Sequence, residues 1–191
     1  HRVDRRQRQM CIRDSIMMGS RSEESSRPIR ARNTKRRAGS ESPAGRFAIP
    51  TTLVAGPPGS GKSTWVRERA KPGDLILDTD LLYMSLSGCS RYTKPQPLLP
   101  FVLEAFEAAE NRLLSMSDVG HAWIISAAPK IAQRAYYANR GAEVVVLAVP
   151  AAECIRRIAH DPVRNQPDAD WEGWINRWWR DYRPDEHAAI G

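Results

Sequence analysis

A single short segment carries the strongest chemical signal in this chain. Residues 56–63 read Gly-Pro-Pro-Gly-Ser-Gly-Lys-Ser, which fits the spacing GxxxxGK[ST] of a phosphate-binding loop. Glycines let backbone N–H groups curl around phosphate oxygens, Lys62 can reach the β- and γ-phosphates, and the Ser63 hydroxyl can bind Mg²⁺. The expected nucleotide contacts are Gly56, Pro57, Pro58, Gly59, Ser60, Gly61, Lys62, Ser63 and Thr64. We therefore expect the chain to bind ATP with Mg²⁺.

Two acidic residues, Asp78 and Asp80, follow an apolar stretch at residues 74–78 that reads as a buried strand. Because they are one residue apart, an extended segment would point both side chains the same way, toward the phosphate loop. We assign Asp78, with Ser63, to Mg²⁺ and Asp80 to the general base that accepts a proton from a hydroxyl acceptor. The alternative is that one of these acids only caps the following helix.

The residues after the third and fourth predicted strands also bear on the chemistry. The strand at 122–126 is followed by Ala127, where many ATPases place an aspartate for the metal, and this disfavours a motor ATPase. Ser126 can still contact a metal-bound water. Three arginines after the fourth strand have the charge to neutralise phosphate oxygens in a closing lid: Arg156, Arg157 and Arg164. We assign Arg157 to catalysis and Arg164 to nucleotide binding.

The order of strands and helices positions these residues. Continuous apolar strands are expected at 51–55, 74–78, 122–126 and 143–148, and they alternate with helical segments. This pattern predicts an α/β three-layer sandwich of the P-loop NTPase type, with a mainly four-stranded parallel sheet covered on both faces. The last helix, at 170–182, has an aromatic stripe that we interpret as a core-closing face rather than a base-stacking platform. The stripe consists of Trp171, Trp174, Trp178 and Tyr182.

The net charge of +7 is distributed unevenly along the 191 residues. Residues 1–50 hold 13 basic and 5 acidic residues, whereas residues 51–191 hold 16 and 17. We predict a disordered basic tail at 1–46 and an ATP-binding domain at 47–191. Within the tail, residues 5–15 match the translation of a widely used transposase sequencing adapter, so this stretch is set aside as a scar and Met17 or Met18 becomes a candidate start. The alternative for residues 21–46 is a nucleic-acid-binding arm.

Cysteine content and hydropathy indicate the compartment. The three cysteines, Cys11, Cys89 and Cys154, have no metal-ligand spacing, so we expect reduced thiols and a cytoplasmic protein. No apolar run approaches the length of a membrane span, so no membrane partner is expected.

The chain resembles P-loop kinases, in particular bacteriophage polynucleotide 5′-kinases and small phage proteins labelled AAA family ATPases. The resemblance spans residues 51–183 and is carried by the loop segment 56–68, by Asp80, by Tyr92-Thr93-Lys94, and by the lid segment from Val149 to Arg157. It implies that Asp80 is the catalytic aspartate and Arg157 the lid arginine. Two positions depart from the polynucleotide kinases: Tyr83 replaces an arginine for the acceptor's phosphate, and Ala127 replaces an acid. The pattern Asp78-Thr79-Asp80 looks equally like small-metabolite kinases of the shikimate or gluconate type.

These observations predict an Mg²⁺-dependent kinase that transfers the γ-phosphate of ATP to a hydroxyl on a polynucleotide, a nucleoside or a small metabolite. The alternative is a hydrolytic or non-catalytic ATP-binding accessory protein of phage DNA metabolism, which the missing acid after the third strand would suit. The acceptor and the oligomeric state stay open at this stage.

Deletion of residues 1–46 should leave the melting temperature and the ATP affinity unchanged. A tail of this composition has no apolar face to pack against the domain. Scanning calorimetry and ATP titration of the two chains measure both quantities. A drop of several degrees in the truncated chain would show that the tail contributes to folding.

Overall fold

The computed structural model describes residues 45–115, 118–164, 169–184 and 189–190. Of the predicted basic tail at 1–46, residues 1–44, which include the adapter-like stretch 5–15, lie outside this part of the chain. No helix within the described ranges is both long and apolar enough to cross a bilayer.

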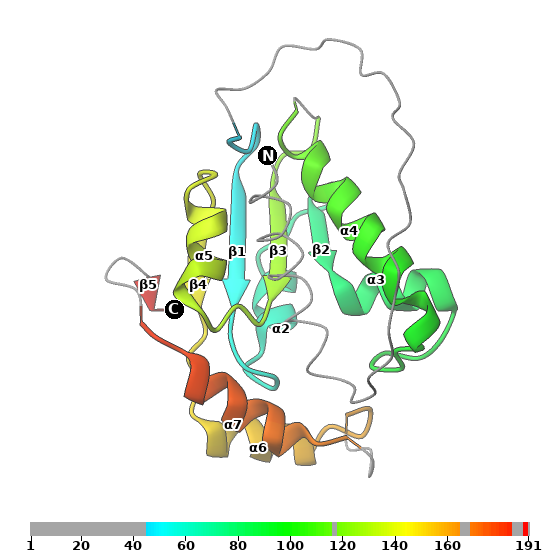
Figure 1. Cartoon of the computed structure of the whole chain (residues 1–191), viewed down its shortest axis with the longest axis vertical. Coiled ribbons are helices and arrows are strands. Elements are labelled where there is room, and N and C mark those ends of the chain that lie inside the picture. The colour runs from blue at the N-terminus through cyan, green and yellow to red at the C-terminus, as the bar shows by residue number, and fades with distance from the viewer. Residues whose placement is uncertain (1–44, 116–117, 165–168, 185–188, 191) are drawn as a thin grey trace, which may run out of the picture.

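A parallel sheet forms the centre of the molecule (Figure 1). Its strands are β1 (Thr51–Ala55), β2 (Leu75–Asp78), β3 (Ala122–Ser126), β4 (Glu143–Val146) and β5 (Ala189–Ile190). They are ordered β2-β3-β1-β4-β5, and each neighbouring pair is parallel. The predicted four-stranded sheet is confirmed, with β5 added at its edge. Two residues are too few to show any periodicity, so the sequence pattern could not have indicated β5.

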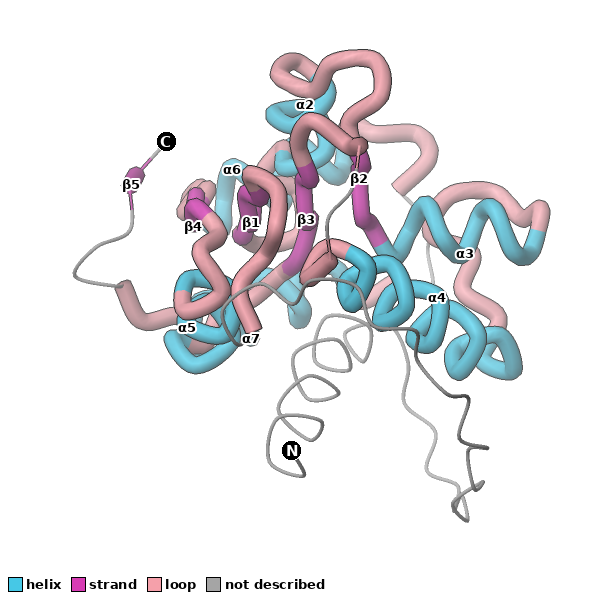
Figure 2. The backbone as a smooth tube through the Cα atoms, turned by 90° about the horizontal axis from the view of Figure 1, so that it is seen from above, coloured by secondary structure: helices cyan, strands magenta, loops and turns pink. Residues whose placement is uncertain are grey.

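Helices cover both faces of the sheet, which gives the predicted three layers (Figure 2). Alternation along β1 explains why both faces are apolar, since Leu53 packs in a core cluster on one side and Val54 in a different cluster on the other. The first cluster includes residues from α4 (Leu99–Arg112) and α5 (Ile131–Ala138), and the second includes Val66 of α2 (Lys62–Arg67). The remaining helical elements between β2 and α4 are α3 (Thr79–Ser87) and the short 3-10 helix η2 (Gln96–Leu98).

Two further helices, α6 (Ala151–Ala159) and α7 (Trp171–Asp181), lie together beyond the carboxyl ends of the strands (Figure 1). They share a small apolar cluster of Cys154, Ile158 and Ile175. Trp178 anchors α7 to the main core, because its side chain is fully buried and its indole N–H donates to the carbonyl oxygen of Ala127 at 2.7 Å. This hydrogen bond fixes the helical pair relative to the end of β3.

Replacement Trp178→Phe should lower the free energy of unfolding by about 1–3 kcal/mol, since it removes a buried indole donor and leaves a carbonyl acceptor less satisfied. The neighbouring Trp179 provides a matched control. Its indole nitrogen has no hydrogen-bond partner among the described residues, so Trp179→Phe loses no such bond. Urea denaturation of both variants measures the difference. Equal destabilisation would show that the bond to Ala127 does not anchor α7.

Candidate functional site

The phosphate-loop segment leaves β1 and turns sharply before α2. Gly59 and Gly61 have φ values of 80° and 92°, in the region that disfavours side chains. A Cβ atom on Gly59 would also lie 2.7 Å from the carbonyl oxygen of Cys154 in α6. Glycine at this position therefore lets the loop pack directly against α6.

The side chain of Lys62 folds back onto the start of the loop. Its Nζ donates to the carbonyl oxygens of Gly56 and Pro57, both at 2.8 Å. Burial of the ammonium lowers its pKa to about 8, and the nearby positive charge of Arg164 acts in the same direction. An anionic phosphate at this place would restore a partner of opposite charge to the lysine.

Two cavities adjoin the loop, and Gly59, Gly61 and Arg164 border both. The first, of about 220 Å³, is lined by residues that include Pro58, Lys62, Ser63, Asp78 and Asp80. The second, of about 500 Å³, is lined by residues that include Ser60, Thr64, Trp65, Leu147, Val149 and Arg157. The predicted loop contacts from Pro58 to Thr64 are thus divided between two adjoining spaces, whereas Gly56 and Pro57 line neither.

Asp78 is the N-cap of α3, as the capping alternative allows. Its Oδ1 accepts from the backbone N–H of Asp80 at 2.9 Å, and the residue is only 4% exposed. The predicted extended geometry for the two acids is wrong, because the helix begins immediately after β2 and places Asp80 in its first turn. Both carboxylates nevertheless line the first cavity. Burial, together with the neighbouring Asp80, raises the pKa of Asp78.

Asp80 is paired with a lysine from the segment that follows α3. The Nζ of Lys94 lies 2.8 Å from Asp80 Oδ1. Burial would raise the pKa of Asp80, but the charge and the hydrogen bond of Lys94 outweigh it and hold the pKa below its ordinary value. The carboxylate is therefore ionised at neutral pH, which is the form that a general base requires.

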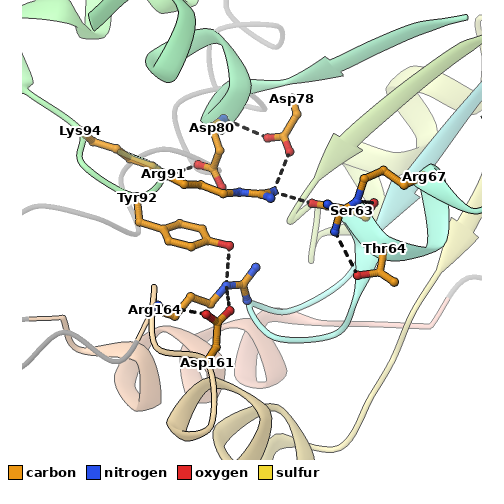
Figure 3. A network of polar contacts seen from close by, with 10 residues as sticks. All are labelled: Ser63, Thr64, Arg67, Asp78, Asp80, Arg91, Tyr92, Lys94, Asp161 and Arg164. Carbon is orange, nitrogen blue, oxygen red and sulfur yellow. Dashed lines mark hydrogen bonds and ion pairs between the residues drawn. The ribbon is translucent and has the colours of Figure 1, made fainter. Parts of the chain in front are cut away.

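Arg91 lies between the two groups predicted to bind the metal (Figure 3). Its Nη2 is 2.9 Å from the Ser63 hydroxyl oxygen and 3.6 Å from Asp78 Oδ2. Hydroxyl and carboxylate oxygens are the ligand types that Mg²⁺ prefers, and the guanidinium shows that a positive charge is accommodated between them. The residues present therefore fit the ion. Sequence reasoning missed Arg91 because it is 28 positions from Ser63 and belongs to no motif.

The three candidate arginines are in different environments. Arg157 donates through Nη1 to the backbone oxygen of Ser60 at 3.4 Å and through Nε to Glu153 at 2.7 Å. Arg164 borders both cavities. Arg156 lines neither cavity described here, and its exposed guanidinium forms two hydrogen bonds with Glu153. The structure thus brings two of the three arginines to the loop.

Aromatic side chains form one wall of the first cavity. They are Tyr92, Trp171 and Trp174. The Tyr92 hydroxyl accepts from Arg164 Nε at 2.6 Å, and its ring packs edge-on against Trp171 with centroids 5.6 Å apart. The aromatic stripe of the last helix therefore has two roles, since Trp178 closes the core while Trp171 and Trp174 face the cavity.

The two departures from the polynucleotide kinase pattern have distinct structural consequences. Tyr83 is 1% exposed and belongs to the main core cluster, so this position contributes no side chain to the first cavity. Ser126 and Ala127 do line the cavity at the end of β3, where no carboxylate is present.

Comparisons with known proteins give only distant similarity. No protein-family model and no curated protein matches the chain. Among solved structures, a gluconokinase from Sinorhizobium meliloti 1021 is 18% identical with a TM-score of 0.49, covering 76% of this chain and 82% of that chain. The tunicamycin resistance protein of Deinococcus radiodurans is 16% identical with a TM-score of 0.46, covering 74% and 86%. A shikimate kinase from Acinetobacter baumannii is 18% identical with a TM-score of 0.43, covering 76% and 87%. Similarity at this level leaves the chemistry to be derived from the side chains of the site.

Replacement Lys62→Ala should weaken ATP binding by about tenfold to a hundredfold, since it removes a charge-assisted hydrogen bond to phosphate. The fold should be kept, because within the described residues the hydrogen bonds of Lys62 Nζ go to two carbonyls of the loop itself. Lys71→Ala is the control, as Lys71 is exposed in the turn after α2 and lines neither cavity. Calorimetric titration with ATP measures the affinities, and circular dichroism checks the fold. Equal affinity for parent and Lys62→Ala would contradict the assignment of the loop.

Proposed function

We propose that this protein is an ATP-dependent phosphotransferase that moves the γ-phosphate of ATP to a hydroxyl group. The observation that supports this most directly is that Asp80, Lys62 and Ser63 line the same cavity. A base for an acceptor hydroxyl thus shares one space with the groups that bind phosphate and metal.

The two cavities suggest how the substrates divide. The larger cavity, with Trp65, Leu147 and Val149 in its lining, suits the nucleoside part of ATP because it offers apolar and aromatic surface. The smaller cavity contains Asp80 and suits the acceptor. The phosphate loop lies between them, so the γ-phosphate would project from the nucleotide side toward Asp80.

The chemistry follows from these positions. The acceptor oxygen attacks the γ-phosphorus, an oxygen–phosphorus bond forms, and the bond from the γ-phosphorus to the β–γ bridging oxygen breaks to release ADP. The acceptor proton passes to the Asp80 carboxylate. Lys62 and Arg157 neutralise charge on the phosphoryl oxygens, while Arg164 holds the nucleotide from the lid. Because Lys94 is hydrogen-bonded to Asp80 Oδ1, the acceptor hydroxyl has to reach the other oxygen or displace this lysine.

Ser63 and Asp78 would hold Mg²⁺, in the position where Arg91 now contacts both. The ion would supply positive charge to the β- and γ-phosphates. Asp78 has a second role as the cap of α3, which fixes Asp80 in the first helical turn.

Two observations bear on which acceptor the protein uses, and they point to different classes. The resemblance to phage polynucleotide 5′-kinases in the loop, at Asp80 and at Arg157 supports a nucleic-acid end. The burial of Tyr83, where those kinases use an arginine, favours instead an acceptor without a phosphate beside the reacting hydroxyl. A nucleoside or a small metabolite meets this condition.

An ATP-binding accessory protein, with hydrolysis or without chemistry, is the second candidate. The observation that favours it is the absence of an acid at the end of β3, where Ser126 and Ala127 line the cavity instead. Incubation of the chain with labelled ATP and a panel of 5′-hydroxyl oligonucleotides, nucleosides and sugars separates transfer from hydrolysis and from binding alone.

Replacement Asp80→Asn should keep the ATP affinity and reduce phosphate transfer by about a hundredfold or more, because it removes the base but not a phosphate contact. Asp118→Asn, at an exposed position outside both cavities, is the control for a carboxylate-to-amide change. Transfer rates with the best acceptor of the panel and ATP titrations measure the two quantities. If Asp80→Asn transfers phosphate at the parent rate, Asp80 is only part of the helix start and the accessory protein becomes the better account.

A further inference from the structure

The segment of residues 88–95 contacts four residues of the candidate site at once (Figure 3). Arg91 contacts Ser63 and Asp78, Tyr92 contacts Arg164, and Lys94 contacts Asp80. We infer that Arg91 competes with Mg²⁺ for the position between Ser63 and Asp78, and that metal binding displaces segment 88–95 and thereby releases Asp80 from Lys94. This inference rests on the proposed function only in requiring that the site binds Mg²⁺ with ATP.

Competition follows from the distances. A guanidinium 2.9 Å from the Ser63 hydroxyl oxygen and 3.6 Å from Asp78 Oδ2 fills the space that an ion bound to both oxygens would need. Two positive charges cannot share it without strong repulsion at such short range. Arg91 must therefore leave when the ion contacts Ser63 and Asp78.

The contacts of Arg91 are incomplete, which makes its departure less costly. Its Nε atom is buried and has no hydrogen-bond partner within the described part of the chain. A buried donor without a partner is unfavourable, so withdrawal of the side chain into water recovers a hydrogen bond for this atom. Asp78 keeps its hydrogen bond from the backbone of Asp80 in either case.

The backbone of the segment couples Arg91 to its neighbours. Tyr92 has a φ of 72°, a left-handed conformation that is unfavourable for a residue with a side chain. The turn around it is held locally, since Thr93 N–H donates to the carbonyl oxygen of Ser90 at 3.1 Å. Because Arg91, Tyr92 and Lys94 lie in one short turn, a backbone shift that accompanies the withdrawal of Arg91 moves the other two contacts as well.

The consequence is an order of binding, in which the metal binds before the acceptor reaches Asp80 Oδ1. With Arg91 between Ser63 and Asp78, Lys94 holds the Asp80 carboxylate and Tyr92 holds the lid arginine Arg164. With the metal in place of Arg91, all three contacts are lost together. Asp80 Oδ1, the oxygen that Lys94 occupies, then becomes available to an acceptor hydroxyl only when the metal and its nucleotide are bound.

Arg91 variants test the competition directly. The measured quantity is the Mn²⁺ concentration that gives half-maximal binding of a non-hydrolysable ATP analogue, with free Mn²⁺ followed by electron paramagnetic resonance. Removal of the competing cation in Arg91→Ala should lower this concentration about tenfold, a typical size for coupling between two ligands. Arg91→Gln removes the charge while keeping a polar side chain of intermediate length, so it should show the same direction if Arg91→Ala folds poorly.

Arg67→Ala is the matched control. Arg67 also contacts Ser63, but through the backbone oxygen at 3.1 Å on the exposed side of α2, so its loss should leave the Mn²⁺ requirement unchanged. An unchanged or higher requirement in both Arg91 variants would overturn the competition. Absence of Mn²⁺-dependent binding in the parent chain would overturn both this inference and the proposed function, whereas normal binding with no Arg91 effect would overturn this inference alone.

Hydrogen exchange tests the displacement. Amides of residues 88–95 should exchange faster when Mn²⁺ and the ATP analogue are added together than when the analogue is added with a chelator. Peptides from α5 serve as the internal reference. Exchange that stays the same or slows in 88–95 would show that the segment remains in place and would contradict the inference.

Discussion

Two carboxylates, Asp78 and Asp80, lie side by side where β2 passes into α3, and the site depends on the compensation of their charge. Buried or partly buried acids are unfavourable unless they receive hydrogen bonds and opposite charges. Asp78 accepts the backbone N–H of Asp80, and the segment after α3 contributes Arg91 and Lys94. This segment therefore supplies positive charge that the acid pair needs.

Compensation of this charge also connects the end of the sheet to the segment beyond α6. Parallel strands end at one edge, so the phosphate loop after β1, the acids after β2 and Ser126 at the end of β3 face a common space. The segment that neutralises the acids also carries Tyr92, whose hydroxyl is bonded to Arg164 beyond α6. Arg91, Tyr92 and Arg164 thus link the acids at the end of β2 to the segment beyond α6.

Local patterns in the sequence predicted much of the fold and part of the site. The phosphate loop is contiguous, and the strands show apolar runs, so both were predictable. Arg91 was not, because its contact with Ser63 spans 28 positions and exists only in the folded chain. Asp80 was expected in extended backbone, but capping by Asp78 begins the helix at once. Periodicity placed Trp171, Trp174 and Trp178 on one helical face. Tertiary packing determines that Trp178 is buried in the core while the other two line the first cavity.

The most direct test of this account is a crystal structure of the full chain with Mn²⁺ and a non-hydrolysable ATP analogue, using anomalous scattering to locate the ion. The account predicts an ion beside the Ser63 hydroxyl and Asp78, phosphates against Lys62, Arg91 withdrawn, and an Asp80 carboxylate that is free of Lys94 and faces the γ-phosphate. A bound nucleotide with Arg91 still between Ser63 and Asp78, and with no anomalous signal there, would contradict it.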